Sequence, residues 1–90
     1  MGGIEDVLQA MRTHPSDLEV QSLACGALWN LALNVDNKVK IGALGGNDDV
    51  LKAMRRHAAD PEVQRRSGGA LWILAANADN EISIDTFGWH

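Results

Sequence analysis

The chain has little of several residue types that mark particular protein classes. Its 90 residues include one cysteine, two prolines, one phenylalanine and no tyrosine. The single cysteine, Cys25, excludes an internal disulfide and is typical of a reducing compartment. No apolar run approaches the roughly 20 residues of a membrane helix, and the N-terminus lacks the charged and apolar regions of a signal peptide. These absences predict a cytoplasmic or nuclear protein that does not enter a membrane.

The charge balance argues against nucleic acid as a partner. The formal net charge is -4, and the eight basic residues occur in both halves of the chain instead of forming one stripe. Hydrophobic residues make up 46% of the chain, which is enough to bury a core. Residues 1–90 are therefore expected to form one small domain.

An internal repeat organises the sequence. Gly-Ala-Leu-Trp-Asn-Leu-Ala at residues 26–32 returns as Gly-Ala-Leu-Trp-Ile-Leu-Ala at residues 69–75, an offset of 43 residues. At that offset no gap is needed, and about half of the aligned residues are identical. The first repeat covers about residues 2–44 and the second about residues 45–87. Such a period indicates units whose cores are completed by their neighbours.

Apolar periodicity predicts three helices in each repeat and no strand. The first lies over residues 3–14 and carries an apolar stripe from Ile4 to Met11. The second begins at the capping residues Ser16 and Asp17 and continues to Asn34 or just past it. Its expected core stripe is Val20, Leu23, Ala24, Ala27, Leu28, Leu31 and Val35.

A third, short helix is expected to follow, lined by Val39, Ile41 and Leu44 and ended by Gly45-Gly46. The cycle then repeats over residues 47–57, 60–77 and 81–87. The whole chain is therefore predicted to be all-α.

Three helices in about 42 residues resemble armadillo repeats of the beta-catenin type. The residues that carry the resemblance are Gly45-Gly46, Val50-Leu51, Glu-Val-Gln at residues 62–64 and the motif at residues 26–32. The resemblance covers nearly the whole chain and implies a right-handed α-solenoid of about two repeats. The chain would begin at the second helix of a repeat and end after a further first helix. HEAT repeats are the alternative, but their two helices per unit leave Val39 to Leu44 unexplained.

The near identity of the two copies is typical of recent duplication, consensus design or an excised fragment, and the sequence leaves these origins open.

The resemblance also implies a function. In armadillo proteins the long third helix lines a concave groove that holds an extended peptide, and an asparagine on that helix bonds the peptide backbone. Asn30 occupies that position here, whereas the second copy has Ile73. Importin-type repeats place a tryptophan four residues earlier, where this chain has Gly26. The implied function is a protein interaction module that binds an extended peptide or a partner protein.

Helical geometry supplies a separate indication of the same surface. At about 100° per residue, Gly26, Trp29, Asn30 and Leu33 lie on one face, opposite the core stripe. One interpretation is a contact surface; the other is that the tryptophans pack between repeats and stiffen the stack. The candidate partner-binding residues are Trp29, Asn30, Leu33, Arg65, Trp72 and Ile73.

The two ends of the chain predict self-association. Repeat proteins usually need more than two units, and neither end has a visible capping repeat. The candidate self-association residues are Ile4 and Leu8 at one end and Ile84, Phe87 and Trp89 at the other. We therefore expect a homo-oligomer, either a dimer or a head-to-tail assembly. The alternative function is a self-assembling structural fragment, natural or engineered, whose main partner is itself.

Nothing in the sequence indicates an enzyme, a metal site or a cofactor. His14 and His57 are a whole repeat apart, which is not the spacing of metal ligands, and Cys25 has no histidine base in its helix. No phosphate-binding or dinucleotide-binding glycine motif is present in the sequence.

Overall fold

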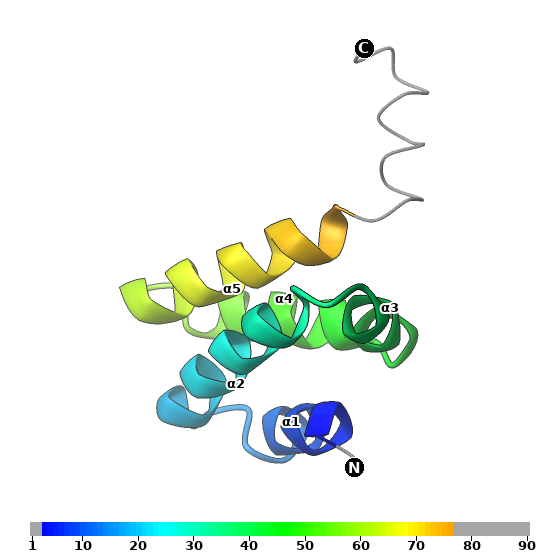
Figure 1. The fold of residues 1–90 in the computed structure, drawn as a ribbon. Helices are drawn as coiled ribbons and strands as arrows, with labels where there is room; N and C mark the ends of the chain where they lie inside the picture. The colour runs from blue at the N-terminus through cyan, green and yellow to red at the C-terminus, as the bar shows by residue number, and fades with distance from the viewer. Residues whose placement is uncertain (1–2, 77–90) are drawn as a thin grey trace, which may run out of the picture.

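A computed structural model describes residues 3–76 as five helices without a strand in that range (Figure 1). The helices are α1 (Gly3–Thr13), α2 (Leu18–Leu31), α3 (Val35–Ala43), α4 (Gly46–Arg56) and α5 (Pro61–Ala75). The all-α prediction is confirmed for these residues. The short helix expected at 81–87 lies outside them.

Side-chain caps set the beginnings of three helices. Asp17 accepts a hydrogen bond from the backbone N–H of Val20 at 3.1 Å, and Asp60 accepts one from Val63 at 2.8 Å. Asn34 caps α3 in the same way. An Asn or Asp at this position satisfies a backbone donor that has no partner inside the helix. Because Asn34 begins α3, α2 ends at Leu31, and the prediction that it continues to Asn34 was wrong.

The pair Gly45-Gly46 allows α3 and α4 to join closely. Gly45 has a φ of +81°, the left-handed conformation that costs other residues about 1–2 kcal/mol. A Cβ on Gly46 would clash with the side chain of Ile41, which is fully buried. The two glycines therefore serve different physical purposes, one in the turn and one at the helix crossing.

Two glutamines hold the helix pairs together in the same manner. The Gln21 side-chain amide donates to the carbonyl oxygens of Met11 and His14, at 3.1 and 3.0 Å. Gln64, its counterpart 43 residues later, donates to Met54 and His57 at 2.9 and 3.1 Å. These bonds satisfy carbonyls at the ends of α1 and α4, which have no partner in the helix. The sequence match is thus accompanied by matched side-chain contacts.

The core forms where α2 packs against α1 on one side and α5 on the other (Figure 1). Of the predicted core stripe of α2, Ala24 and Leu28 are buried. Leu23 and Val35 are 59% and 66% exposed, so their assignment to the core was wrong. Val35 begins α3 at the surface, and Leu23 lies in a groove that the described residues do not cover. In α3 only Ile41 is buried, while Val39 and Leu44 are exposed.

Ile4 and Leu8 are 5% and 1% exposed. The prediction that they lie at an uncovered end, available for self-association, is therefore wrong for both residues. Helix α1 packs on α3 and α4 as well as on α2, and an ion pair of 3.0 Å between Lys40 and Glu5 joins α3 to α1. These contacts bury the apolar stripe of α1 within the chain itself.

Candidate functional site

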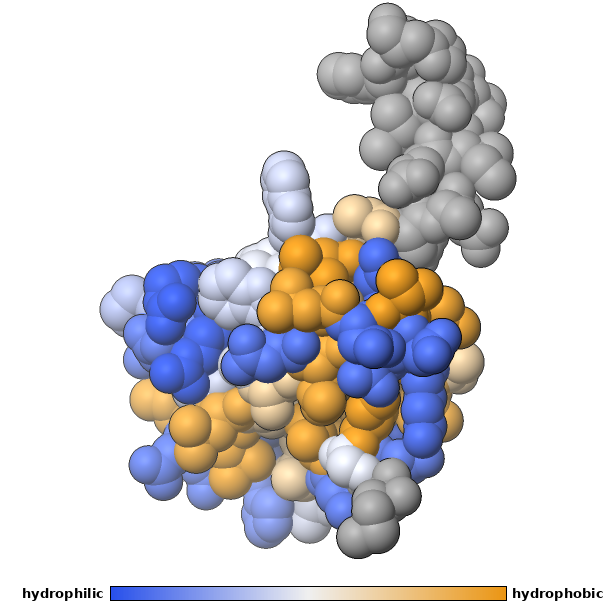
Figure 2. Space-filling view, viewed as in Figure 1, coloured by the Kyte–Doolittle hydropathy of each residue, from blue (hydrophilic) through white to orange (hydrophobic). Residues whose placement is uncertain are grey.

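A groove of about 540 Å³ lies between α2 and α5 and contains three of the predicted partner-binding residues. Trp29, Asn30 and Arg65 all line it, although Arg65 comes from the other repeat. The remaining lining residues are Leu23, Gly26, Ala27 and Arg66. Apolar and hydrophilic surface lie side by side on the face of the molecule that shows α2 (Figure 2). The groove therefore offers an aromatic ring, an amide and two guanidinium groups within one short stretch.

The Trp29 ring rests against the backbone of α5. A Cβ on Gly69 would lie 2.5 Å from the Cε2 and Cζ2 atoms of the Trp29 indole, which is too close for any real contact. Glycine at position 69 is thus what lets the ring approach. Trp29 is half-buried as a result and packs against the hydrophobic core. This contact fits the interpretation that a tryptophan packs between repeats.

The exposed side of Trp29 faces Arg65, whose guanidinium carbon lies 6.0 Å from the ring centroid. At that separation a cation is attracted by the electron-rich face of the ring. Arg65 itself is 59% exposed, so its charge remains accessible to a partner. The groove therefore presents Trp29 and Arg65 as a stacked pair.

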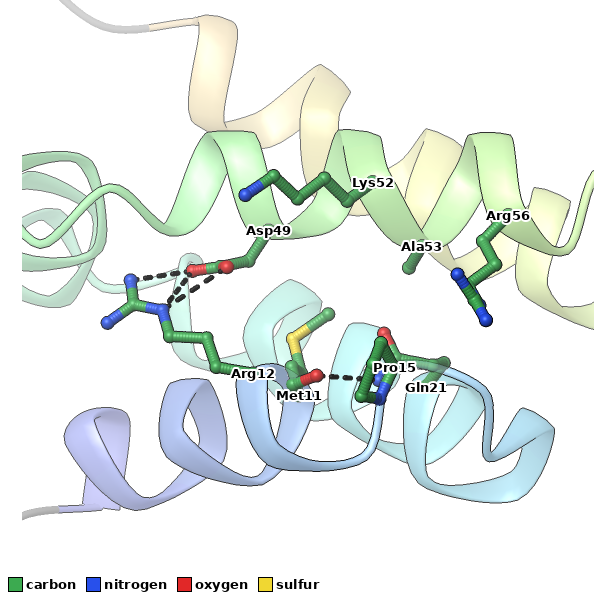
Figure 3. Close-up of a pocket in the computed structure, with 8 residues that line it drawn as sticks. All are labelled: Met11, Arg12, Pro15, Gln21, Asp49, Lys52, Ala53 and Arg56. Carbon is green, nitrogen blue, oxygen red and sulfur yellow. Dashed lines mark hydrogen bonds and ion pairs between the residues drawn. The ribbon is translucent and has the colours of Figure 1, made fainter.

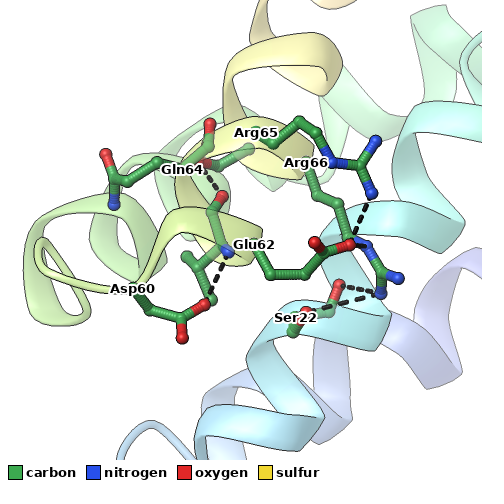
Figure 4. A network of polar contacts seen from close by, with 8 residues as sticks. Ser22, Asp60, Glu62, Gln64, Arg65 and Arg66 are labelled. Atoms are coloured by element: carbon green, nitrogen blue, oxygen red, sulfur yellow. Dashed lines mark hydrogen bonds and ion pairs between the residues drawn. The ribbon is translucent and has the colours of Figure 1, made fainter.

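A polar network holds the two arginines (Figure 4). Glu62 accepts from Arg65 Nη2 at 2.5 Å and from Arg66 Nε at 2.7 Å, and the hydrogen bond from Arg65 lowers the pKa of the Glu62 carboxyl. Arg66 also reaches across to α2 and donates to the carbonyl and hydroxyl oxygens of Ser22, at 3.3 and 3.4 Å. The charged residues that line the groove itself are therefore the two arginines, and Glu62 pairs with both of them.

The other predicted partner-binding residues do not line the groove. Leu33 lies beyond the end of α2 and is exposed, and Ile73 is half-buried against the core. Trp72 is 76% exposed. The two tryptophans of the repeated motif thus differ in exposure, and of the two Trp29 lines the groove. The self-association candidates Ile84, Phe87 and Trp89 lie outside the described residues.

Sequence reasoning did not place Leu23 or Arg66 in the groove. It assigned Leu23 to the core stripe of its helix, and Arg66 is the residue aligned with Leu23 in the second repeat. The aligned pair itself contained a signal, because a position that holds Leu in one copy and Arg in the other is rarely buried completely. Arg66 contacts α2 through its long aliphatic stem, and its Cδ would lie 3.3 Å from a Cβ on Gly26.

The described residues contain no cluster of metal ligands and no reactive thiol. No group of three or more His, Cys, Asp or Glu side chains among them is placed to hold an ion. Cys25 is fully buried, and burial raises the pKa of its thiol to about 11. At neutral pH the thiol is protonated and therefore a poor nucleophile. Across the same residues, no helix has the length and apolar character to cross a membrane.

Comparison with known proteins adds one short match. A stretch of the chain is similar to Protein aardvark of Dictyostelium discoideum. The two are 53% identical over 38 residues, which is 42% of this chain and 5% of Protein aardvark. No protein-family model and no solved structure matches the chain. Because the match spans so little of Protein aardvark, it does not assign the chain to a family.

Proposed function

We propose that this chain is an armadillo-type interaction module of about two repeats that binds an extended peptide in the groove between α2 and α5. In this proposal Asn30 bonds the peptide backbone, Trp29 contacts an apolar or aromatic side chain, and Arg65 pairs with an acidic one.

The observation that carries the proposal is the free amide of Asn30 beside the Trp29–Arg65 pair. The Asn30 side chain is exposed and lines the groove, and it forms no hydrogen bond within residues 3–76. An amide both donates and accepts, so it matches the N–H and C=O groups of one peptide unit. An extended peptide leaves those groups available, whereas a helical partner uses them internally.

The charge of the groove favours an acidic ligand. The charged residues among those that line the groove are Arg65 and Arg66, both cations, whereas Glu62, Glu19 and Asp60 line the adjoining pocket. Arg65 is the more exposed of the two arginines, because Arg66 is held against Ser22. A carboxylate in the peptide would replace solvent around Arg65 and form a charge-assisted hydrogen bond with it.

Selection from a random peptide library, followed by fluorescence polarisation, tests the proposal. We expect the selected peptides to be enriched in Asp and Glu and to bind Asn30→Ala about 3–10-fold more weakly than the wild-type chain, which is the value of one hydrogen bond. Arg65→Ala should weaken binding by about 10-fold or more, because it removes a charged donor.

Lys52→Ala is the matched control, since Lys52 is exposed on α4 and does not line this groove. Its affinity for the selected peptides should equal that of the wild-type chain. If the selected peptides bind the Asn30→Ala and Arg65→Ala variants as tightly as they bind the Lys52→Ala control, they bind another surface of the chain, and the proposed site is wrong.

A further inference from the structure

A second groove, between α1 and α2, is almost entirely apolar. It has a volume of about 390 Å³, and Leu23 is its most exposed large side chain. The other residues that line it are Asp6, Val7, Ala10, Val20, Ala24 and Ala27. We call it the α1–α2 groove.

The same surface is covered in the second half of the chain. The counterpart of Leu23, 43 positions later, is Arg66, whose side chain is 27% exposed. Counterparts of the other six groove residues are between 0% and 7% exposed. They are Asp49, Val50, Ala53, Val63, Ser67 and Ala70. Helices α1 and α2 pack over this surface of α4 and α5. The internal contact between the two halves of the chain therefore indicates which kind of surface would fit the α1–α2 groove.

Two contacts define that internal fit. One is the Trp29 indole against Gly69. The other is the ion pair between Arg12 and Asp49, where Arg12 Nη2 lies 2.7 Å from Asp49 Oδ2 and Asp49 is only 7% exposed (Figure 3). Asp49 is the counterpart of Asp6 in the α1–α2 groove, and Gly69 is the counterpart of Gly26.

The groups that would complete the equivalent fit are present on α4 and α5, and they make no such contact within residues 3–76. Trp72 is the counterpart of Trp29 and is 76% exposed. Arg55 is the counterpart of Arg12, is exposed, and forms no ion pair among residues 3–76. Asp6 is likewise exposed and unpaired within that range. The atoms nearest to a Cβ on Gly26 belong to the side chain of Arg66, which is flexible and would move aside for an indole.

We propose that the α4–α5 end of one copy of this chain packs into the α1–α2 groove of a second copy, head to tail. Trp72 of the first copy lies against Gly26 of the second, and Arg55 of the first pairs with Asp6 of the second. The contact repeats the internal packing of the chain. It shares Leu23, Gly26 and Ala27 with the peptide groove proposed above, but it does not rest on Asn30 or Arg65.

The occupant is a second copy because both the shape and the charge of the groove have their complement on this chain. A symmetric dimer that used only the α1–α2 groove would leave both Asp6 carboxylates without Arg55. A head-to-tail pair keeps one free groove, on the first copy, and one free Trp72, on the second, so association continues into a ring or an open chain.

Light scattering coupled to size exclusion, over a wide range of protein concentration, tests the proposal. The mass of the wild-type chain should rise above 9.7 kDa as its concentration increases. Trp72→Ala and Leu23→Glu should each associate at least about 30-fold more weakly, because each removes a central apolar anchor of the interface. Both side chains are exposed, so circular dichroism should show both variants folded.

A mixture of these two variants gives the decisive result. Trp72→Ala keeps an intact α1–α2 groove, and Leu23→Glu keeps an intact Trp72. Mixed in equal amounts, they should form a one-to-one dimer that does not grow further. A mixture that stays monomeric while the wild-type chain associates would overturn the head-to-tail contact, and a wild-type chain that is monomeric at all concentrations would overturn association altogether.

Charge exchange tests the ion pair separately. Asp6→Arg and Arg55→Asp should each weaken association, and the double variant, which restores opposite charges across the contact, should recover it. A double variant as weak as either single one would show that the two residues do not meet. The Asn30→Ala variant should bind peptides more weakly, as proposed above, but it should self-associate like the wild-type chain. The peptide proposal and the self-association proposal can therefore fail separately.

Discussion

The contact between Trp29 and Gly69 leads to a quantitative prediction about two neighbouring glycines of α5. In the interior of a helix, Gly→Ala stabilises by about 0.5–1 kcal/mol, because alanine loses less backbone entropy on folding. A Cβ on Gly68 would meet nothing within 4 Å. Gly68→Ala should therefore raise the free energy of unfolding by that full amount.

Gly69→Ala should have the opposite effect, although it makes the same chemical change one residue later. The new Cβ would lie 2.5 Å from Trp29 Cε2 and Cζ2, so the indole has to move away from α5. Overpacking of this kind costs about 1–3 kcal/mol. We expect Gly69→Ala to be about 1–3 kcal/mol less stable than Gly68→Ala.

Urea unfolding followed by far-UV circular dichroism measures this difference. In thermal unfolding, a domain of this size should show a Tm difference of about 4–8 °C for each kcal/mol. Dilute protein is needed, because association would add a concentration-dependent term to the stability.

Trp29→Ala provides the control background. Without the indole, Gly69→Ala and Gly68→Ala should stabilise the chain equally. If the two alanine variants already have equal stability with Trp29 present, the indole does not lie against Gly69, and the description of the groove between α2 and α5 would be wrong.

Two further predictions concern the interior. Replacing Gln21 by Met keeps the length of the side chain but removes the amide that donates to the Met11 carbonyl, while the His14 carbonyl keeps the N–H of Asp17. Urea unfolding should therefore show a loss of about 1–3 kcal/mol. The same change at Gln64 should cost less, since Gln64 is only partly buried and water can replace its amide; an equal or larger loss there would contradict this. The Cys25 thiol should react with a thiol reagent only through opening of the fold, because it is fully buried and its pKa is raised to about 11. In urea, where the chain is unfolded, the reaction rate of Cys25 should approach that of a free thiol. A fast reaction in native buffer would show that the contacts of α2 open readily.

Local signals in the sequence predicted most of the helices. Asp60 followed by Pro61 marked the beginning of α5, and Gly45-Gly46 marked the join between α3 and α4. Capping hydrogen bonds and glycine conformations act over a few residues, so they can be recognised without the fold. The end of α2 was predicted too late because Asn34, which caps the next helix, was counted within the preceding one.

The candidate site was predictable only in part. Helical periodicity placed Trp29 and Asn30 on one face of α2, and both line the groove. That Arg65 meets Trp29 depends on the packing of α2 against α5, and the exposure of Leu23 depends on which helices cover it. No spacing along the chain contains that information.

The repeated tryptophan shows most directly what the tertiary structure decided. Trp29 and Trp72 occur in the same Gly-Ala-Leu-Trp sequence, on helices of similar length. Helical periodicity predicts the same face of the helix for both residues. Trp29 is half-buried and Trp72 is 76% exposed, because α5 packs over Trp29 and no described element packs over Trp72 in the same way. A side chain is buried only where another element packs against it, and the local sequence around that side chain does not specify whether such an element is present.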